Sequence, residues 1–216
     1  MKPLLIFHIN GDWRGVQHEI LQNHQYSIED VVSISVGIDG ISVISEEDAE
    51  KVSKIKLAGG AGFIVGNDAM LNQQRLSGYM RIKKMGLPIV SVKSNHASVA
   101  SDIRIRENVF IDHAARILMG CNIGANTWVM QGSELGSGCK VGSSCWIGRN
   151  CYISENVVIG KNCTIGDGVI IDPGVVIPEW SVLKGSGVRI SQSPSNTIFL
   201  DPRFRAPVTM FHSNIS

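Results

Sequence analysis

Cysteine is the first residue type here that could support chemistry, because thiolates bind metals and form disulfides. The chain has five, at positions 121, 139, 145, 151 and 163, separated by 18, 6, 6 and 12 residues, all multiples of six. None forms a Cys-x-x-Cys pair, and no histidine stands beside them at ligand spacing. We therefore expect no metal site and no disulfide, and we interpret the cysteines as small buried residues.

A second candidate site lies near the start of the chain, where residues 10–15 read NGDWRG. This segment follows a predicted strand and precedes a predicted helix, which is the place of a phosphate-binding loop. It does not match G-x-G-x-x-G, because only Gly11 and Gly15 could let the backbone approach a pyrophosphate, and Asp12 would repel one. Two interpretations stay open, a nucleotide-binding loop and an ordinary turn between strand and helix.

Composition limits the classes of protein to which the chain can belong. Its 216 residues are 44% hydrophobic and 18% charged, which is enough to bury a core. Twenty basic and nineteen acidic residues give a net charge of +1, unlike a dedicated nucleic-acid-binding protein. No apolar run approaches the roughly 18 residues of a membrane span, and the apolar stretch in MKPLLIFHIN is too short for a signal peptide. We expect a cytoplasmic protein.

A six-residue period organises the second half of the chain. Every sixth residue from Val99 to Leu183 is Val, Ile or Leu, the position two residues earlier is small at most repeats, and glycine often follows directly. Residues two apart on a strand face the same side, so the small and aliphatic residues both point inward. Three short strands and three corners then make an 18-residue turn of a triangular prism. The pattern predicts a hexapeptide parallel β-helix of about five turns over residues 95–186.

Stacking by 18 residues also predicts which outward side chains are neighbours. Phe110, Trp128 and Trp146 lie one above another on one face, and Arg116 lies beneath Glu134 on a second. We expect the three aromatic residues to form a large exposed apolar patch, which requires a partner or a ligand. A subunit interface and a wall for a cofactor are both compatible with it.

The first ninety residues have a different pattern, in which strands and helices alternate with short connections. Such alternation predicts a small open parallel sheet, with ligands at the carboxyl ends of its strands, near residues 8–15, 37–40 and 66–68. The predicted strands cover residues 4–9, 31–36, 62–65 and 88–92, and the predicted helices cover residues 11–21, 46–55 and 69–85.

Four segments resemble bacterial sugar acetyltransferases of the NeuD/PglD type. The first is similar to a strand of that family, the second to its junction between domains, and the last two to its late coils and closing loop. They are FIVGND (63–68), SVKSNHASV (91–99), NVVIGKNCTIG (156–166) and PEWSVLKGSG (178–187). The resemblance implies an α/β Rossmann-like domain over residues 1–92, a left-handed parallel β-helix over residues 93–187 and an irregular tail over residues 188–216.

The resemblance also implies ligands and a mode of assembly. In this family the first domain holds a nucleotide-linked amino sugar, and acetyl-CoA lies along the prism between two subunits of a homotrimer. By position, the sugar nucleotide would contact Asn10, Gly11, Asp39 and Asn67, and acetyl-CoA would contact Trp146, Gly166 and Gly185.

The resemblance places a catalytic histidine in a corner where this chain has Ser137, with no carboxylate beside it. Two other side chains could replace the missing base. Glu155 lies in the same corner column one turn further along, roughly 5 Å away by strand spacing. His113 stands beside Asp112, which could orient it, but a neighbouring subunit would have to bring it close. Each is equally interpretable as an ordinary surface residue.

The expected function is therefore acetyl-CoA-dependent acetylation of an amino sugar, nucleotide-linked and destined for surface polysaccharide. An amine attacks as its free base, so loss of the histidine is easier to tolerate in N-acetylation than in O-acetylation. Two alternatives stay open, a catalytically silent relative that serves as a binding or assembly subunit, and an enzyme with another acyl donor or acceptor.

Residues 188–216 have lost the hexad, and we expect an extended segment that packs along the prism or on a neighbouring subunit.

Overall fold

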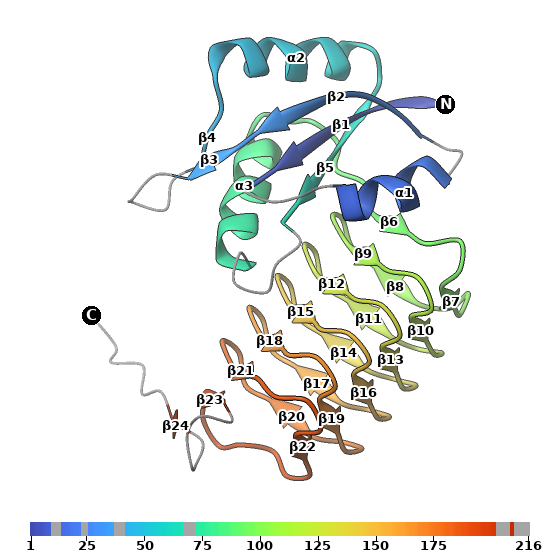
Figure 1. The fold of residues 1–216 in the computed structure, drawn as a ribbon, viewed down its shortest axis with the longest axis vertical. Coiled ribbons are helices and arrows are strands. Elements are labelled where there is room, and N and C mark those ends of the chain that lie inside the picture. The colour runs from blue at the N-terminus through green and yellow to red at the C-terminus, as the bar shows by residue number, and fades with distance from the viewer. Residues whose placement is uncertain (10–13, 23–25, 37–41, 67–71, 202–207, 210–216) are drawn as a thin grey trace.

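A small α/β module lies along one side of a prism of stacked coils in this computed structural model (Figure 1). The structure describes residues 1–9, 14–22, 26–36, 42–66, 72–201 and 208–209. No helix within these ranges is long and apolar enough to cross a membrane.

The N-terminal module, from β1 to α3, is built on a parallel three-stranded sheet in the order β2-β1-β5. A short antiparallel pair, β3 with β4, adjoins it. The elements are β1 (Lys2–His8), α1 (Arg14–Gln22), β2 (Tyr26–Ser33), β3 (Ser35–Val36), β4 (Ser42–Val43), α2 (Glu46–Leu57), β5 (Ala61–Val65) and α3 (Asn72–Lys84). The predicted parallel sheet is confirmed, while its assignment as Rossmann-like stays a prediction.

Local signals explain why these segments adopt these structures. The four central residues of β1 are fully buried, as a strand covered on both faces requires. Helix α2 starts at Ser45, whose hydroxyl accepts a 3.1 Å hydrogen bond from the backbone N–H of Asp48. The strand predicted over residues 88–92 differs, because only Ile89 bridges to the sheet, at Gly62, and Val92 already belongs to the prism.

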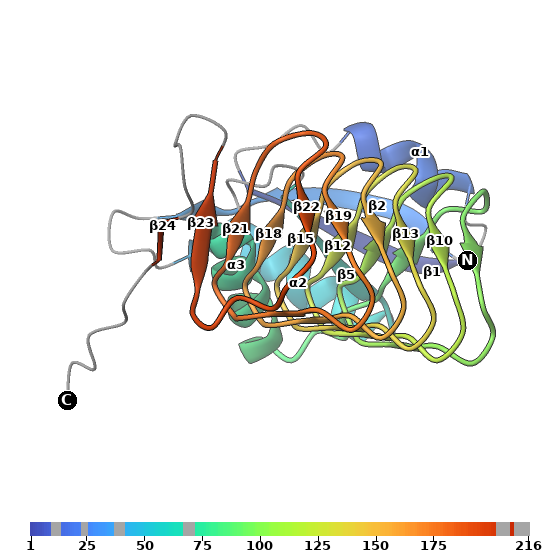
Figure 2. The ribbon, with the colours of Figure 1, turned by 90° about the horizontal axis from the view of Figure 1, so that it is seen from below.

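The prism consists of three parallel sheets whose strands follow one another around the axis, in coils that Figure 2 shows side by side. The first sheet contains β7 (Ser98–Val99), β10 (Arg116–Ile117), β13 (Glu134–Leu135), β16 (Tyr152–Ile153), β19 (Ile170–Ile171) and β22 (Arg189–Ile190). The second contains β8 (Arg104–Ile105), β11 (Asn122–Ile123), β14 (Lys140–Val141), β17 (Val158–Ile159) and β20 (Val176–Ile177). The third contains β6 (Val92–Lys93), β9 (Phe110–Ile111), β12 (Trp128–Val129), β15 (Trp146–Ile147), β18 (Thr164–Ile165), β21 (Val182–Leu183), β23 (Ile198–Leu200) and β24 (Val208–Thr209).

The hexad pattern accounts for the interior of the prism. From Ile111 to Leu183, every residue of the aliphatic column is at most 5% exposed and belongs to one core. Strands pair with a shift of 18 residues, as predicted, so Arg116 lies opposite Glu134 and forms a 2.8 Å ion pair with it. Stacked aliphatic side chains therefore hold the coils together from within.

The column of small residues has a second role that the sequence analysis missed. All five cysteines are free and buried, and the Cys139 thiol donates to the carbonyl of Ser154 at 3.0 Å. Thr127 makes the same contact with the carbonyl of Gly142 at 2.8 Å. These side chains satisfy corner carbonyls that the ladders leave unpaired. Burial raises the pKa of the Cys151 thiol to about 11, so that thiol stays protonated and unreactive at neutral pH.

The glycine column is explained by close contact and not by unusual dihedral angles. A Cβ on Gly142 would lie 2.7 Å from the backbone of Gly160 in the next turn, so a side chain there has no room. The left-handed backbone occurs two residues further on, for example at Asn126 with φ 60° and Gly138 with φ 74°. In the corners that carry such a glycine, the residue in close contact with the next turn thus comes first, and the residue with a positive φ follows two positions later.

The chain after Gly187 also differs from the predicted irregular tail. Strand β22 pairs with β19, and β23 pairs with β21, both in parallel, so the ladders extend beyond the last full hexad. Strand β24 then pairs with β23 in the antiparallel direction.

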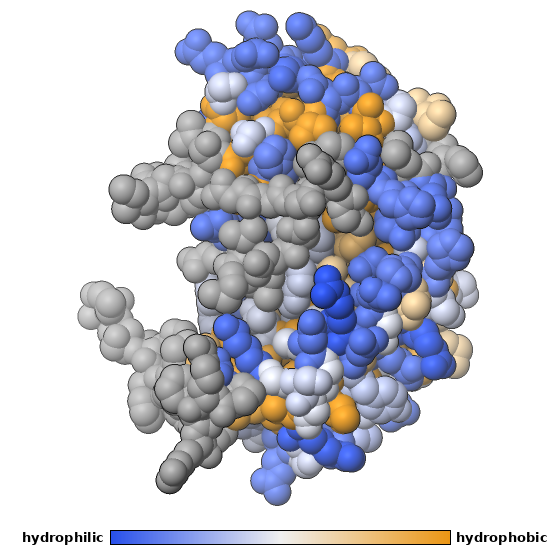
Figure 3. Space-filling model, in the orientation of Figure 1, coloured by the Kyte–Doolittle hydropathy of each residue, from blue (hydrophilic) through white to orange (hydrophobic). Residues whose placement is uncertain are grey.

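Figure 3 shows a mostly hydrophilic surface over the prism, with apolar residues gathered beneath α2 and near the far end of the prism.

Candidate functional site

The clearest cluster of reactive side chains lies where α1 meets the first turns of the prism. His113 follows β9 in a prism corner, and its Nδ1 lies 3.2 Å from Asp112 Oδ1. The Asp112 carboxylate accepts two backbone hydrogen bonds, from His113 N–H at 2.8 Å and from Gln131 N–H at 3.2 Å. The backbone therefore fixes Asp112, and Asp112 in turn orients His113, as the sequence predicted.

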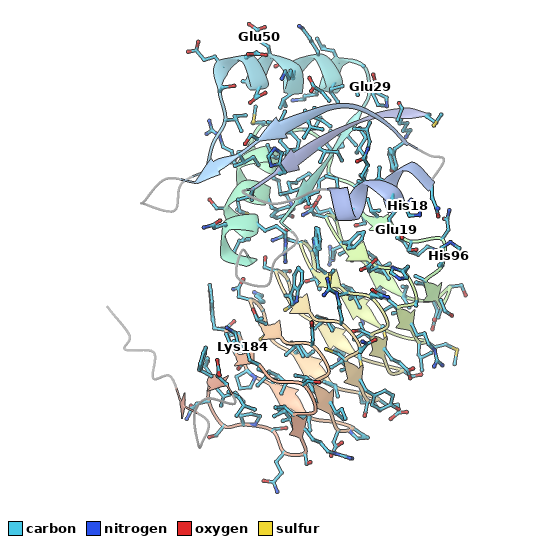
Figure 4. The ribbon with its side chains drawn as sticks, viewed as in Figure 1. His18, Glu19, Glu29, Glu50, His96 and Lys184 are labelled. Carbon is cyan, nitrogen blue, oxygen red and sulfur yellow. The ribbon has the colours of Figure 1, made fainter. Side chains whose placement is uncertain are left out.

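A cavity of about 310 Å³ opens beside this pair, between α1 and the prism. Val16 and Ile20 face the prism and are buried, and Glu19 lies on the same side of the helix. Figure 4 shows His18 and Glu19 on α1, close to the first prism strands. The lining residues are Val16, His18, Glu19, Phe110, Asp112, His113, Met130, Gln131 and Arg149.

Ser137 and Glu155 are neighbours in one corner column, as predicted. The carbonyl of Ser137 accepts a 2.9 Å hydrogen bond from the N–H of Asn156, which places Glu155 directly beside it in the next turn. Glu155 is exposed, while Ser137 is half-buried. This column lies between the first and second sheets, whereas His113 lies between the third and the first. Within one chain, the structure brings Ser137 and Glu155 together and leaves His113 in another corner.

Phe110, Trp128 and Trp146 form an aromatic ladder in the predicted register. The prediction that this ladder is exposed is wrong, because Trp128 is fully buried and Trp146 is only 7% exposed. Phe63 of β5 stacks on Trp128 with ring centroids 6.1 Å apart. The module of the same chain thus covers the ladder, in place of the subunit contact or cofactor that the sequence predicted.

Arg75 completes this interface, and no sequence motif pointed to it. It is fully buried, and its guanidinium lies 5.2 Å from the ring centroid of Trp128 and 5.9 Å from that of Trp146. It donates to the carbonyls of Gly66 at 2.9 Å and Asn126 at 3.2 Å. Burial lowers the pKa of Arg75 to about 9, which still leaves it charged at neutral pH.

The expected cofactor residues lie towards the end of the prism. A Cβ on Gly166 would lie 3.6 Å from the nitrogen of Gly185, so these two glycines adjoin in one corner column. The N–H of Gly166 donates to the carbonyl of Leu183 at 2.6 Å, and the carbonyl of Gly166 accepts from the Cys151 thiol at 3.0 Å. The backbone N–H of Gly166 is therefore already used within the prism. Trp146 has its ring against Arg75 and is only 7% exposed.

The expected sugar-nucleotide residues, Asn10, Gly11, Asp39 and Asn67, lie outside the described residues. The described ends of β1 and β5 lead into two of these segments from one edge of the sheet, since His8 pairs with Val65. Two buried polar residues that sequence reasoning missed, Glu19 and Arg75, have a common signal. Each is a charged residue on the apolar face of a predicted helix, which is rare unless the charge has a purpose.

Comparisons with known proteins agree with this architecture. The family described as bacterial transferase hexapeptide (six repeats) matches residues 144–179. No curated protein sequence matches the chain significantly. The structure is similar to the acetyltransferase domain of PglB from Neisseria gonorrhoeae in complex with acetyl coenzyme A, with a TM-score of 0.75, 16% identity and coverage of 97% of this chain and 99% of that one.

Two further solved structures have the same overall fold. A mutant of perosamine N-acetyltransferase from Caulobacter crescentus, in complex with CoA and GDP-perosamine, has a TM-score of 0.73 and 19% identity, with coverage of 90% of this chain and 91% of that one. WeeI from Acinetobacter baumannii has a TM-score of 0.62 and 18% identity, with coverage of 92% and 98%. This chain therefore has the fold of these three structures, and its residues 144–179 match the bacterial transferase hexapeptide repeat.

Proposed function

We propose that the chain is an acetyltransferase that uses acetyl-CoA to acetylate the amino group of a nucleotide-linked sugar. The observation that carries this proposal is the similarity over nearly the whole length of both chains to enzymes crystallised with CoA and GDP-perosamine or with acetyl coenzyme A. That similarity spans the N-terminal module as well as the prism. With it we propose a Rossmann-like first domain, a left-handed winding of the prism and a homotrimer.

The module would hold the sugar nucleotide at the carboxyl ends of β1 and β5, where ligands bind in open parallel sheets. Asn10, Gly11, Asp39 and Asn67 belong to segments that follow strands of this module, and they are the proposed contacts. Acetyl-CoA would lie along the prism near Gly166 and Gly185, with Trp146 as a further proposed contact. Gly166 and Gly185 adjoin in one corner column, and Trp146 lies on β15 in the third sheet.

When the acceptor is an amine, the attack can begin without a base, and a base is needed only to take up the proton afterwards. The nitrogen lone pair attacks the thioester carbonyl, the C–S bond breaks, and CoA leaves as a thiolate. The proton that the nitrogen loses passes to that sulfur, to water or to a nearby base. Glu155, beside Ser137, is one proposed base, and His113, held by Asp112, is the other.

The first test is calorimetric titration of the purified protein with acetyl-CoA, together with its mass in solution. We expect saturable micromolar binding by a trimer. CoA release is then measured with a panel of nucleoside-diphosphate amino sugars. A well-folded protein that binds no acetyl-CoA would exclude it as the donor. Saturable binding without turnover on any acceptor would favour the silent relative, which the comparisons do not support.

Alanine variants distinguish the two proposed bases. Replacing the catalytic base lowers kcat by about 100-fold or more, since general base catalysis contributes about that much. Glu50→Ala and His96→Ala are controls of the same side-chain types, because both residues are exposed. Glu50 lies on α2, away from the prism (Figure 4), and His96 adjoins the corner of His113 without lining the cavity. A variant of Glu155 or His113 with an unchanged rate would remove that residue from the mechanism.

A further inference from the structure

We propose that Glu19, Asp112 and His113 form a binding site for a divalent transition-metal ion of the Zn²⁺ or Co²⁺ class. Each side chain offers one ligand atom, and these atoms all lie within 4.8 Å of one another. They line the cavity between α1 and the prism. The site shares Asp112 and His113 with one of the two proposed bases, while Glu19 has no role in the proposed acetyl transfer.

Glu19 carries the argument, because one oxygen of its buried carboxylate has no hydrogen-bond partner. The residue is 5% exposed, and its Oε2 has no hydrogen-bond partner. None of the ion pairs between described residues includes it. A buried carboxylate without a partner is strongly unfavourable, so such a group is normally paired, protonated or bound to a metal. A cation in the cavity would supply the missing partner.

Helix α1 holds Glu19 on its buried face. Val16 and Ile20 are buried in the core that joins the module to the prism, and Glu19 lies between them on the same helical face. The end of α1 is fixed as well, since the side-chain amide of Asn95 donates to the carbonyl of Gln22 at 2.8 Å. The carboxylate is therefore held towards the prism corner that carries His113.

The other two ligands are already arranged as a metal would require. His113 Nδ1 and Asp112 Oδ1 lie 3.2 Å apart. Ligand atoms around a tetrahedral zinc ion, with bonds of about 2.0–2.1 Å, are separated by about 3.4 Å. The backbone N–H groups of His113 and Gln131 hold the Asp112 carboxylate, and such outer contacts orient the ligands of metal sites.

The charges of the cavity also suit a divalent cation. Glu19 and Asp112 together supply two negative charges, which one such ion neutralises. Arg149 and His18 on the cavity wall are exposed, so solvent screens any charge they carry. Three protein ligands leave at least one coordination position open, and the cavity of about 310 Å³ has room for water there. A site of this form is accessible from solvent.

The test measures metal binding by the full chain, without CoA or an acceptor. The protein is stripped with a chelator and titrated with CoCl₂ by visible absorption and with ZnCl₂ by calorimetry. We expect one equivalent of metal per chain and a Co²⁺ spectrum more intense than that of the hydrated ion. Glu19→Gln and His113→Gln should each weaken binding by more than about 100-fold, because loss of an outer-shell contact alone costs about 10–100-fold.

The control variants are Glu50→Gln and His96→Gln, which make the same substitutions at exposed positions outside the cavity. Both should bind the metal as the unaltered chain does. Glu19→Gln removes a buried charge without changing its shape, so this variant is expected to fold, which circular dichroism verifies. Absence of binding by the unaltered chain, or equal binding by Glu19→Gln, would overturn the proposal. Neither result decides whether the chain transfers acetyl groups, because Glu155 is the other proposed base and acetyl transfer is measured separately.

Discussion

Arg75 is the residue on which the contact between module and prism depends most. It is the one fully buried arginine among the described residues, and it contacts backbone carbonyls and two indole rings. Among its acceptors are the carbonyls of Gly66, Asn126 and Cys145, which come from both parts of the chain. The planar guanidinium can reach them all at once, which an ammonium group cannot.

Arg75→Lys should therefore destabilise the protein by about 2–4 kcal/mol, because buried carbonyls lose their donor and the stacking on Trp128 is lost. The measurement is urea unfolding followed by tryptophan fluorescence. Arg81→Lys is the matched control on the same helix, where the side chain is exposed, and should change stability by less than about 0.5 kcal/mol. Equal effects of the two substitutions would contradict the role given to Arg75.

Gly142→Ala tests whether space or backbone conformation selects glycine in the corners. The new Cβ would meet the backbone of Gly160 at 2.7 Å, and no rotamer change can relieve this contact. We expect a loss of at least about 3 kcal/mol. Gly174→Ala is the control, because its φ is +72° and nothing lies within 4 Å, so only the cost of the left-handed backbone, about 1–2 kcal/mol, applies. Thermal unfolding of both variants decides between the two causes.

At the scale of elements, α3 is tied to the prism by a polar contact at its end. Tyr79 and Lys83 both donate hydrogen bonds to the Glu107 carboxylate, in the corner before β9. Burial favours the neutral acid, but the two donors outweigh it and hold the pKa of Glu107 below its ordinary value of 4.5. The contact is therefore strongest when Glu107 is ionised.

This depressed pKa predicts a specific dependence on pH. The unfolded chain binds the proton more tightly, so the stabilisation is fully present above the ordinary value of 4.5 and is lost as the pH falls through the lower folded value. Glu107→Gln should lower the urea midpoint at pH 7, and its difference from the unaltered chain should be smaller at an acidic pH below 4.5. Glu50→Gln, on the exposed face of α2, should show no difference at either pH. A difference of the same size in acid would exclude this explanation.

For the whole molecule, the decisive feature is the contact by which the N-terminal module packs on the prism, which forms the seat of the module. Asn108, in a corner with φ 54°, accepts from the N–H of Ile64 at 2.8 Å and donates to its carbonyl at 3.2 Å. It also donates to Asn126 at 2.8 Å, which donates in turn to Ser144 at 3.1 Å. A column of corner residues thus continues the hydrogen bonding of β5 into the prism.

Asn108→Ala should loosen this seat, because the N–H and carbonyl of Ile64 are left buried without their partner, at a cost of about 2–4 kcal/mol. The backbone amide of Ile64 should exchange with deuterium faster, while amides in the late prism coils keep their protection. Asn156→Ala is matched in backbone conformation, with φ 57°, but its side chain is exposed. We expect it to cost less than about 1 kcal/mol and to leave exchange at Ile64 unchanged.

The register of the prism could be predicted from sequence because each contact joins residues at a fixed separation of 18, which a repeat displays directly. The packing of the module on the prism could not be predicted from the sequence. An outward Trp128 is exposed in an isolated prism, and only the docked β5 buries it. The meeting of Glu19 with His113 depends on the same docking. Repeats encode their own stacking, while contacts between unlike parts leave no periodic signal.

The seat of the module ends early along the prism, and this has a consequence for how such chains evolve. The corner column of the seat runs from Asn108 to Ser144, and the covered aromatic ladder runs from Phe110 to Trp146. Coils beyond β16 contact mainly their own neighbours through a constant offset, as in other linear repeats. Insertions or deletions of whole coils there alter the length of the molecule and preserve both register and seat. Coil number is thus a separate evolutionary variable from the architecture of the first domain.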